Sequence, residues 1–133
     1  MDLIVNNKSN CISVYNDTKV PIKPLIITSA HSGTLFTKDF SEKNRKFSNY
    51  FPMQDMFIND IVENLEYLEV PIIRNHISRV IIDLNRDKRE INRKILKNFP
   101  SNLEFLNSLK VKAGIGLIPN KASEGCEIYK EKL

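Results

Sequence analysis

Cysteine is scarce in this sequence of 133 residues, and no apolar run is long. The two cysteines, Cys11 and Cys126, are far apart and show no metal-ligand spacing, which argues against a disulfide framework and favours a reducing compartment. No apolar stretch approaches the roughly 20 residues that a membrane-spanning helix needs. The N-terminus, MDLIVNNKSN, lacks the basic start and long apolar core of a secretory signal. These absences predict a soluble, cytoplasmic protein with no membrane partner.

Charge of one sign is also not concentrated along the chain. The formal net charge of +4 would suit a nucleic-acid partner. Basic residues nevertheless lie beside acidic ones in KDFSEKNRK, NRDKREINRK and YKEK, and no basic stripe is interleaved with aromatic residues. A nucleic-acid-binding module therefore ranks last among the interpretations, and we expect no nucleic-acid partner.

The chain does contain strand-like and helix-like segments in alternation, which is typical of an α/β domain. Residues 1–23 are polar with short apolar islands, and we interpret them as an N-terminal arm or a first strand. Apolar residues from Asp55 to Leu68 recur at three- and four-residue steps, which predicts an amphipathic helix that begins near Asp55. Shorter segments complete the pattern: strands over 25–28, 70–75, 79–84 and 113–119, and a short helix over 101–109.

The length of the chain limits how much of such a fold it can form. A chain of 133 residues suits one modest core, so we expect a single domain over residues 1–133. Parallel strands need layers on both faces of their sheet, but only one segment is strongly helical. The sequence therefore predicts either a lean α/β domain or the front part of a larger fold, incomplete as it stands.

Two apolar runs end in polar side chains that could carry chemistry. PLIITSAHSGTLF leads to His31, and RVIIDLNRD leads to Asp83, Asn85 and Arg86. In open α/β sheets ligands bind outside the carboxyl ends of the strands, so the two ends are candidates for one site. A histidine beside a glycine turn is suited to be a metal ligand or a general base. Arg86 offers a planar fork for a carboxylate, and Arg79 could supply another.

Each of these residues also has a purely structural interpretation, which the sequence leaves open. His31 could be a hydrogen-bonded turn residue, and Asp55 could be the N-cap of the helix that follows it. Asp83 and Arg86 could form an internal salt bridge that holds their loop. Composition and spacing therefore predict an α/β domain with two polar strand ends, and they name no reaction.

Four blocks of the sequence, in this order, carry a resemblance to a known family: PLIITSAHSGTLF, QDMFINDIVENL, SRVIIDLNRD and AGIGLIPNKASEGCEIYKEKL. From about Pro24 to Leu133 the chain resembles the N-formylglutamate amidohydrolases. The first block is similar to the opening strand of that family with its His-Ser-Gly, and the third is similar to its Asp-Leu-Asn-Arg segment. The resemblance implies an α/β fold with a phosphorylase/hydrolase-like core related to the zinc carboxypeptidases, a mixed sheet with flanking helices.

The resemblance also implies a chemistry. Such proteins are zinc-dependent hydrolases that release formate from N-formyl-glutamate in histidine breakdown, or act on a related small N-acyl amino acid. By position, His31 and Asp55 would be metal ligands. Arg79, Asn85 and Arg86 would bind the carboxylates of the substrate. A catalytic zinc takes three protein ligands and activates a water molecule at its fourth position. We assign no catalytic residue in this sequence.

The resemblance covers only the N-terminal part of the family's chains. Those chains continue past the Ile-Tyr block to a second His-Ser motif with a further zinc ligand and to the catalytic carboxylate, and neither is in these 133 residues. We expect either an amidohydrolase, as a single chain or as one half of a split enzyme that needs a second chain, or a non-catalytic remnant. Zinc uptake and formate release would favour the first, and poor solubility with weakly cooperative unfolding would favour the second.

Overall fold

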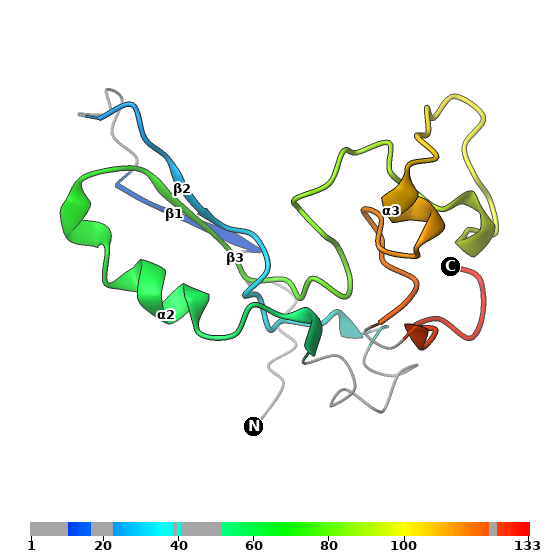
Figure 1. Cartoon of the computed structure of the whole chain (residues 1–133), viewed down its shortest axis with the longest axis horizontal. Helices are drawn as coiled ribbons and strands as arrows, with labels where there is room; N and C mark the ends of the chain where they lie inside the picture. The colour runs from blue at the N-terminus through cyan, green and yellow to red at the C-terminus, as the bar shows by residue number, and fades with distance from the viewer. Residues whose placement is uncertain (1–10, 17–22, 39, 41–51, 123–124) are drawn as a thin grey trace.

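A three-stranded mixed sheet lies at one side of the molecule in the computed structural model, which describes residues 11–16, 23–38, 40, 52–122 and 125–133 (Figure 1). The strands are β1 (Ile12–Tyr15), β2 (Ile27–Ser29) and β3 (Ile72–Asn75), in the order β1-β3-β2. The central strand β3 runs antiparallel to β1 and parallel to β2, so that Ile73 lies opposite both Val14 and Thr28. The expected α/β class with a mixed sheet is confirmed.

The helices of the described residues are short. They include α2 (Ile58–Glu63), the 3₁₀ turns η2 (Glu66–Leu68) and η3 (Arg93–Ile95), and α3 (Leu109–Lys112). Helix α2 lies against β2, and Val62, Val70 and Ile72 form a buried apolar cluster on that face of the sheet. A second buried cluster holds the later part of the chain, and it consists of Phe36, Phe40, Val80, Ala122 and Ile128. None of the described helices has the length and apolar character to cross a membrane.

Strand β1 lies within residues 1–23, the segment expected to be an N-terminal arm or first strand. The remainder of that segment before residue 11 and over 17–22 lies outside the described residues. Most of the polar stretch that follows Gly33 in the sequence, over 41–51, also lies outside them.

The helix expected from Asp55 begins later, at Ile58, and Asp55 does not cap it. Phe57 occupies the N-cap position with a left-handed backbone (φ 66°) and no side-chain cap bond. Asp55 is held elsewhere, because its backbone N–H donates to the carbonyl of His31. The N-cap interpretation of Asp55 was therefore wrong, and its carboxylate is available to the site described below. The α-helix also ends early, at Glu63, before the 3₁₀ turn η2.

The strand expected over 25–28 forms two residues later than predicted and is not buried throughout. Pairing with β3 begins at Ile27, whose backbone N–H donates to the carbonyl of Pro71. Leu25 and Ile26 precede the paired region and are exposed. Their apolar side chains predicted burial, but none of the described residues covers them.

The strand expected over 79–84 does not form. The backbone N–H groups of Ile81 and Ile82 both donate to the carbonyl of Ser78, which closes a turn. Burial of Val80 in the second cluster, not membership of a sheet, accounts for the apolar run. The strand expected over 70–75 forms over Ile72–Asn75, as β3.

Two predictions near the C-terminus were also wrong. Residues 101–108 are not helical, and α3 begins only at Leu109, where the Ser108 hydroxyl accepts a bond from the backbone N–H of Val111. Residues 113–119 form no strand. Gly116 packs directly on a neighbouring segment there, because a Cβ at this position would lie 2.4 Å from the carbonyl oxygen of Glu90.

Candidate functional site

The loop after β2 places His31 at the carboxyl end of the sheet. Parallel pairing with the chain beyond β3 continues through two isolated bridges, Gly33 with Ser78 and Leu35 with Ile77. The close approach explains the glycine, because a Cβ on Gly33 would lie 2.2 Å from the carbonyl oxygen of Ile77. His31 is therefore carried by a backbone segment that is fixed on both sides.

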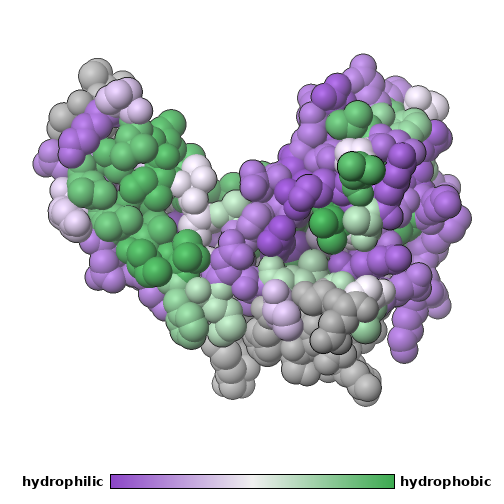
Figure 2. All heavy atoms as spheres, in the orientation of Figure 1, coloured by the Kyte–Doolittle hydropathy of each residue, from purple (hydrophilic) through white to green (hydrophobic). Residues whose placement is uncertain are grey.

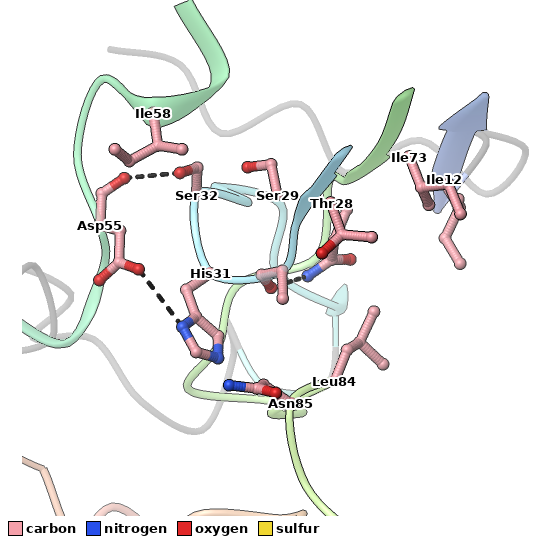
Figure 3. Close-up of a pocket in the computed structure, with 12 residues that line it drawn as sticks. Ile12, Thr28, Ser29, His31, Ser32, Asp55, Ile58, Ile73, Leu84 and Asn85 are labelled. Carbon is pink, nitrogen blue, oxygen red and sulfur yellow. Dashed lines mark hydrogen bonds and ion pairs between the residues drawn. The ribbon is translucent and has the colours of Figure 1, made fainter. Parts of the chain in front are cut away.

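Asp55 lies beside His31 because two hydrogen bonds hold their backbones together. The Ser32 hydroxyl donates to the carbonyl of Asp55 at 2.6 Å, and the backbone N–H of Asp55 donates to the carbonyl of His31 at 3.3 Å. The carboxylate Oδ2 of Asp55 then lies 3.3 Å from Nδ1 of His31 (Figure 3). The Asp55 side chain is 54% exposed, so this side of the imidazole opens to solvent.

Asp83 lies on the other side of the imidazole and is the most connected residue of the site. Its carboxylate is 1% exposed and accepts from Nε2 of His31 at 2.7 Å. It also accepts from Nε of Arg79 at 3.1 Å and from the backbone N–H of Asn85 at 3.0 Å, and it pairs with Arg86 at 3.3 Å. The internal salt bridge between Asp83 and Arg86, one of the interpretations that the sequence left open, is confirmed.

The charge state of Asp83 follows from these contacts. Burial acts to raise the pKa of this carboxyl group, but the hydrogen bonds from His31 and the Asn85 backbone and the charge of Arg79 together outweigh burial and lower the pKa. Asp83 is therefore ionised at neutral pH and can only accept hydrogen bonds. It follows that Nε2 of His31 carries a proton.

The second ring nitrogen of His31 is then left in an unusual position. When the ring is neutral, Nδ1 presents a lone pair, and that lone pair faces a carboxylate oxygen of Asp55 at 3.3 Å. Two electron-rich atoms at this distance repel each other unless a proton or a metal cation lies between them. The His31–Asp55 pair is therefore suited to bind a cation.

The three residues predicted to bind substrate carboxylates are close together but not equivalent. Asn85 lines the cavity beside His31, whereas Arg79 and Arg86 lie behind it on Asp83. Arg86 is the more constrained arginine, because its Nε donates to the carbonyl of Ile115 and its Nη1 to that of Asn85. Within the described residues Arg79 contacts only Asp83, through Nε, so its terminal nitrogens have no partner there.

A cavity of about 390 Å³ adjoins the site. His31 lies between Asp55 and Ser32 on one side and Asn85 and Leu84 on the other (Figure 3). The remaining lining of the cavity comes from the strands, from Ala30 directly after β2, and from the start of α2: Ile12, Thr28, Ser29, Ala30, Ile58, Ile73 and Asn75. Polar and apolar side chains therefore share one open hollow at the end of the sheet.

A second set of hydrogen bonds fixes the backbone under the cavity. Asn59 of α2 accepts from the Ser29 hydroxyl at 2.7 Å and donates to the carbonyl of Ser32 at 3.3 Å. Asn75 of β3 donates to the carbonyls of Ala30 and Ile77, both at 2.8 Å. These amides tie the helix and the central strand to the loop that carries His31.

Sequence reasoning placed Asp83 at one of the two polar strand ends and offered it as a possible loop salt bridge, but it gave Asp83 no role in the site and missed its contact with His31. The signal was present, because Asp83 follows one apolar run as His31 follows another, and ligands bind at the carboxyl ends of the strands in open α/β sheets. The metal question is different: in the part of the chain that the structure describes, no group of three or more His, Cys, Asp or Glu side chains could hold a metal ion. The site thus offers two cation ligands, His31 and Asp55, where a catalytic zinc takes three.

Comparisons with known proteins agree with this arrangement of blocks and strands. The family model for N-formylglutamate amidohydrolase matches residues 23–133. The crystal structure of N-formylglutamate amidohydrolase from Ralstonia eutropha JMP134 has a similar fold, with a TM-score of 0.71 and 23% sequence identity, over 92% of this chain and 42% of that one. This chain therefore spans less than half of the length of that enzyme. A search of the curated proteins found no match.

The family assignment is stronger than the structural likeness, which at this identity establishes the fold alone. The family match runs without a break from the approach to β2 through the last residue, and so includes His31, Asp55, Asp83 and both arginines. The chain belongs to the N-formylglutamate amidohydrolase family.

Proposed function

We propose that this chain forms part of a zinc-dependent hydrolase that cleaves the amide bond of an N-formyl or other N-acyl amino acid. One observation carries the proposal: Nδ1 of His31 faces Oδ2 of Asp55 at 3.3 Å while Asp83 holds the opposite ring nitrogen at 2.7 Å. Family membership supplies the substrate class. The core would then be of the zinc carboxypeptidase type, and a place in histidine breakdown and in the cytoplasm stays a prediction from the sequence.

The distance between the two atoms fits a shared zinc ion. Two ligands of one tetrahedral zinc, each about 2.0 to 2.2 Å from the metal, lie about 3.3 to 3.5 Å from each other. The separation of 3.3 Å in this chain matches that spacing. A zinc ion bound there would lower the pKa of a bound water towards neutrality and polarise the carbonyl of the substrate.

Asp83 has a defined part in this site. A metal-ligating histidine is oriented by a hydrogen bond from its other ring nitrogen to an acceptor such as a carboxylate. Asp83 is such an acceptor for His31, and it is itself fixed by Arg79 and Arg86. The buried carboxylate therefore sets which nitrogen of His31 faces the cavity.

The substrate carboxylates would be bound on the other side of His31. The Asn85 amide lines the cavity and can contact the substrate directly. Two arginines against one aspartate leave a net positive charge behind Asn85, which attracts an anionic substrate. Of the two, Arg79 has the terminal N–H groups without partners in the described residues, so we assign it the closer role and Arg86 the supporting one.

A second candidate is a non-catalytic remnant of the family. The specific observation in its favour is that the described residues supply two metal ligands and not three. In this case the His31–Asp55 pair binds no zinc, and the site keeps only the internal network around Asp83. We rank this reading second because the pair retains the spacing of two ligands of one metal.

The experiment is a zinc-binding measurement joined to a formate assay. The purified chain is titrated with zinc, and formate release from N-formyl-glutamate is followed with and without a second chain that carries the remainder of the family fold. We expect zinc binding that His31→Ala and Asp55→Ala both abolish, and that Asp60→Ala, an exposed acidic control in α2, leaves unchanged. Absence of zinc binding under every condition would establish the remnant.

A further inference from the structure

The cavity of the candidate site has an apolar wall. Ile12 of β1, Ile73 of β3 and Leu84 line it in the right half of Figure 3, and Ile58 lines it at the start of α2. Ile12, Ile58 and Leu84 are 38–47% exposed, so a ligand can reach them. Hydrophobic residues also gather over the sheet and α2 as a whole, whereas hydrophilic residues dominate the side that carries α3 (Figure 2). A ligand in the cavity therefore contacts apolar surface from several segments of the chain.

Most polar side chains that line the cavity are already hydrogen-bonded within the protein. The Ser29 hydroxyl donates to Asn59 of α2, and the Ser32 hydroxyl donates to a backbone carbonyl. The amide nitrogen of Asn75 donates to two backbone carbonyls, and its amide oxygen accepts a backbone N–H. These groups fix the backbone around the cavity, and they have little capacity left for the polar groups of a ligand.

One end of the cavity is suited to an anionic group. In the part of the chain that the structure describes, the Asn85 amide and the Thr28 hydroxyl line the cavity and have no hydrogen-bond partner for their side chains. Arg79 and Arg86 lie behind Asn85 on Asp83 and make this end positive. None of the described residues that line the cavity is a lysine or an arginine. The cavity thus offers one place for a carboxylate, and its apolar wall offers no second one.

These observations define the ligand more closely. We propose that the cavity prefers an N-acyl amino acid with one carboxylate and an apolar side chain, such as N-formyl-leucine, over N-formyl-glutamate. The carboxylate lies at Asn85, and the apolar side chain packs on Ile73 and Leu84. The second carboxylate of N-formyl-glutamate meets apolar side chains there and finds no hydrogen-bond donor to replace its water.

The volume of the cavity, about 390 Å³, is within the range of about 300–1,000 Å³ that is typical of small-molecule sites. The proposal rests on the proposed function for the N-acyl group and for the amide bond that is cleaved. The preference for an apolar side chain, in contrast, depends only on the residues that line the cavity. The two can therefore be tested separately.

The test compares the binding of N-formyl-leucine and N-formyl-glutamate, which share the formyl group and the α-carboxylate. The whole chain is titrated with each compound, with and without zinc, by calorimetry and NMR. We expect N-formyl-leucine to bind at least about tenfold more tightly, because a single methylene in an apolar pocket is worth about 10–200-fold in discrimination. It should shift the methyl signals of Leu84 and Ile73 as well as the side-chain amide signal of Asn85.

Substitution of the apolar wall should reverse the preference. Leu84→Arg places a cation in the cavity, so the ratio of the two affinities should shift about tenfold or more towards N-formyl-glutamate. Leu109→Arg in α3 is the matched control, because this leucine is 82% exposed and does not line the cavity, and the ratio should stay unchanged. Circular dichroism shows whether each variant folds. If Leu84→Arg unfolds the chain, Ile58→Arg makes the same test from α2.

Three results overturn the proposal: N-formyl-glutamate binds as tightly as N-formyl-leucine or more tightly, neither compound binds, or the Leu84 and Leu109 variants have equal ratios. Zinc uptake and formate release are followed in the same samples, which separates this proposal from the proposed function. Formate release that is faster from N-formyl-glutamate refutes the preference and supports the function. Binding of N-formyl-leucine that Leu84→Arg weakens, with neither zinc uptake nor formate release, refutes the function and supports the preference.

Discussion

Replacing Asp83 with alanine should destabilise the protein more than any other single change in the site. The carboxylate is 1% exposed, pairs with two guanidinium groups, orients His31 and accepts one backbone N–H. Removing one partner of a buried ion pair leaves uncompensated charge and costs about 3–5 kcal/mol. Because whole domains are stable by only about 5–15 kcal/mol, this is a large share of the free energy of unfolding.

The assay for this prediction is urea unfolding followed by circular dichroism. With a slope of about 1–3 kcal/mol per molar urea, typical of small domains, Asp83→Ala should lower the midpoint by at least about 1 M. Asp83→Asn, which keeps the shape and one acceptor, should lie between the variant and the wild type. Asp87→Ala is the matched control, because Asp87 also pairs with an arginine, Arg89, but both side chains are exposed; we expect little change.

A double-mutant cycle shows whether the effect arises from the network itself. Arg86→Met alone should be destabilising, and in the absence of Asp83 the same change should cost much less, because the charge that it removes is already unpaired. Two results would contradict the stabilising role of the Asp83 network. One is a shift of the urea midpoint in Asp83→Ala that is no larger than the shift in Asp87→Ala, and the other is simple addition of the effects of Asp83→Ala and Arg86→Met.

Three further changes test local features. Gly33→Ala would place a Cβ 2.2 Å from the Ile77 carbonyl oxygen, so we expect a loss of about 1–3 kcal/mol or more in the free energy of unfolding, together with a shifted His31 signal in NMR spectra. Phe57→Gly should raise the free energy of unfolding by up to about 1 kcal/mol, and with it the urea midpoint, because an exposed phenylalanine at φ 66° is strained and glycine is not. Burial, and then the charge of Arg74, lower the pKa of His76 below its usual value of 6.5. The unfolded chain therefore protonates this histidine more readily than the folded protein does, and the stability falls as the pH drops below about 6.5. Unfolding midpoints at pH 7.5 and 5.5 should differ less in His76→Gln than in the wild type.

The sequence predicted the parts of the molecule where local pattern and tertiary environment agree. The run over 70–75 contains the central strand β3, because β1 and β2 pair with it on either side and Val70 and Ile72 are buried. The polar ends of two apolar runs did come together, as the rule for α/β sheets anticipates, and His31 contacts both Asp55 and Asp83. The resemblance identified the family, which the family model confirms over residues 23–133.

The errors share a physical origin, in that tertiary contacts decided what local pattern could not. The apolar run over 79–84 has the composition of a strand, but Ser78 closes a turn and Val80 is buried in a cluster with residues far away in the sequence. Asp55 has the features of an N-cap, yet its bonds to the loop of His31 draw it away from the helix. Arg79 and Arg86 contact Asp83 whereas Asn85 lines the cavity, and the spacing of these residues in the sequence does not show this difference.

The most direct test of the account is the ¹⁵N NMR spectrum of the His31 ring during a zinc titration. The structure predicts that Nε2 carries the proton in the zinc-free protein, since it donates to Asp83, and that zinc shifts the Nδ1 resonance. In Asp55→Ala the zinc-induced shift should disappear while the proton stays on Nε2. A zinc-dependent shift at Nε2, or a ring that zinc leaves untouched, would contradict the account.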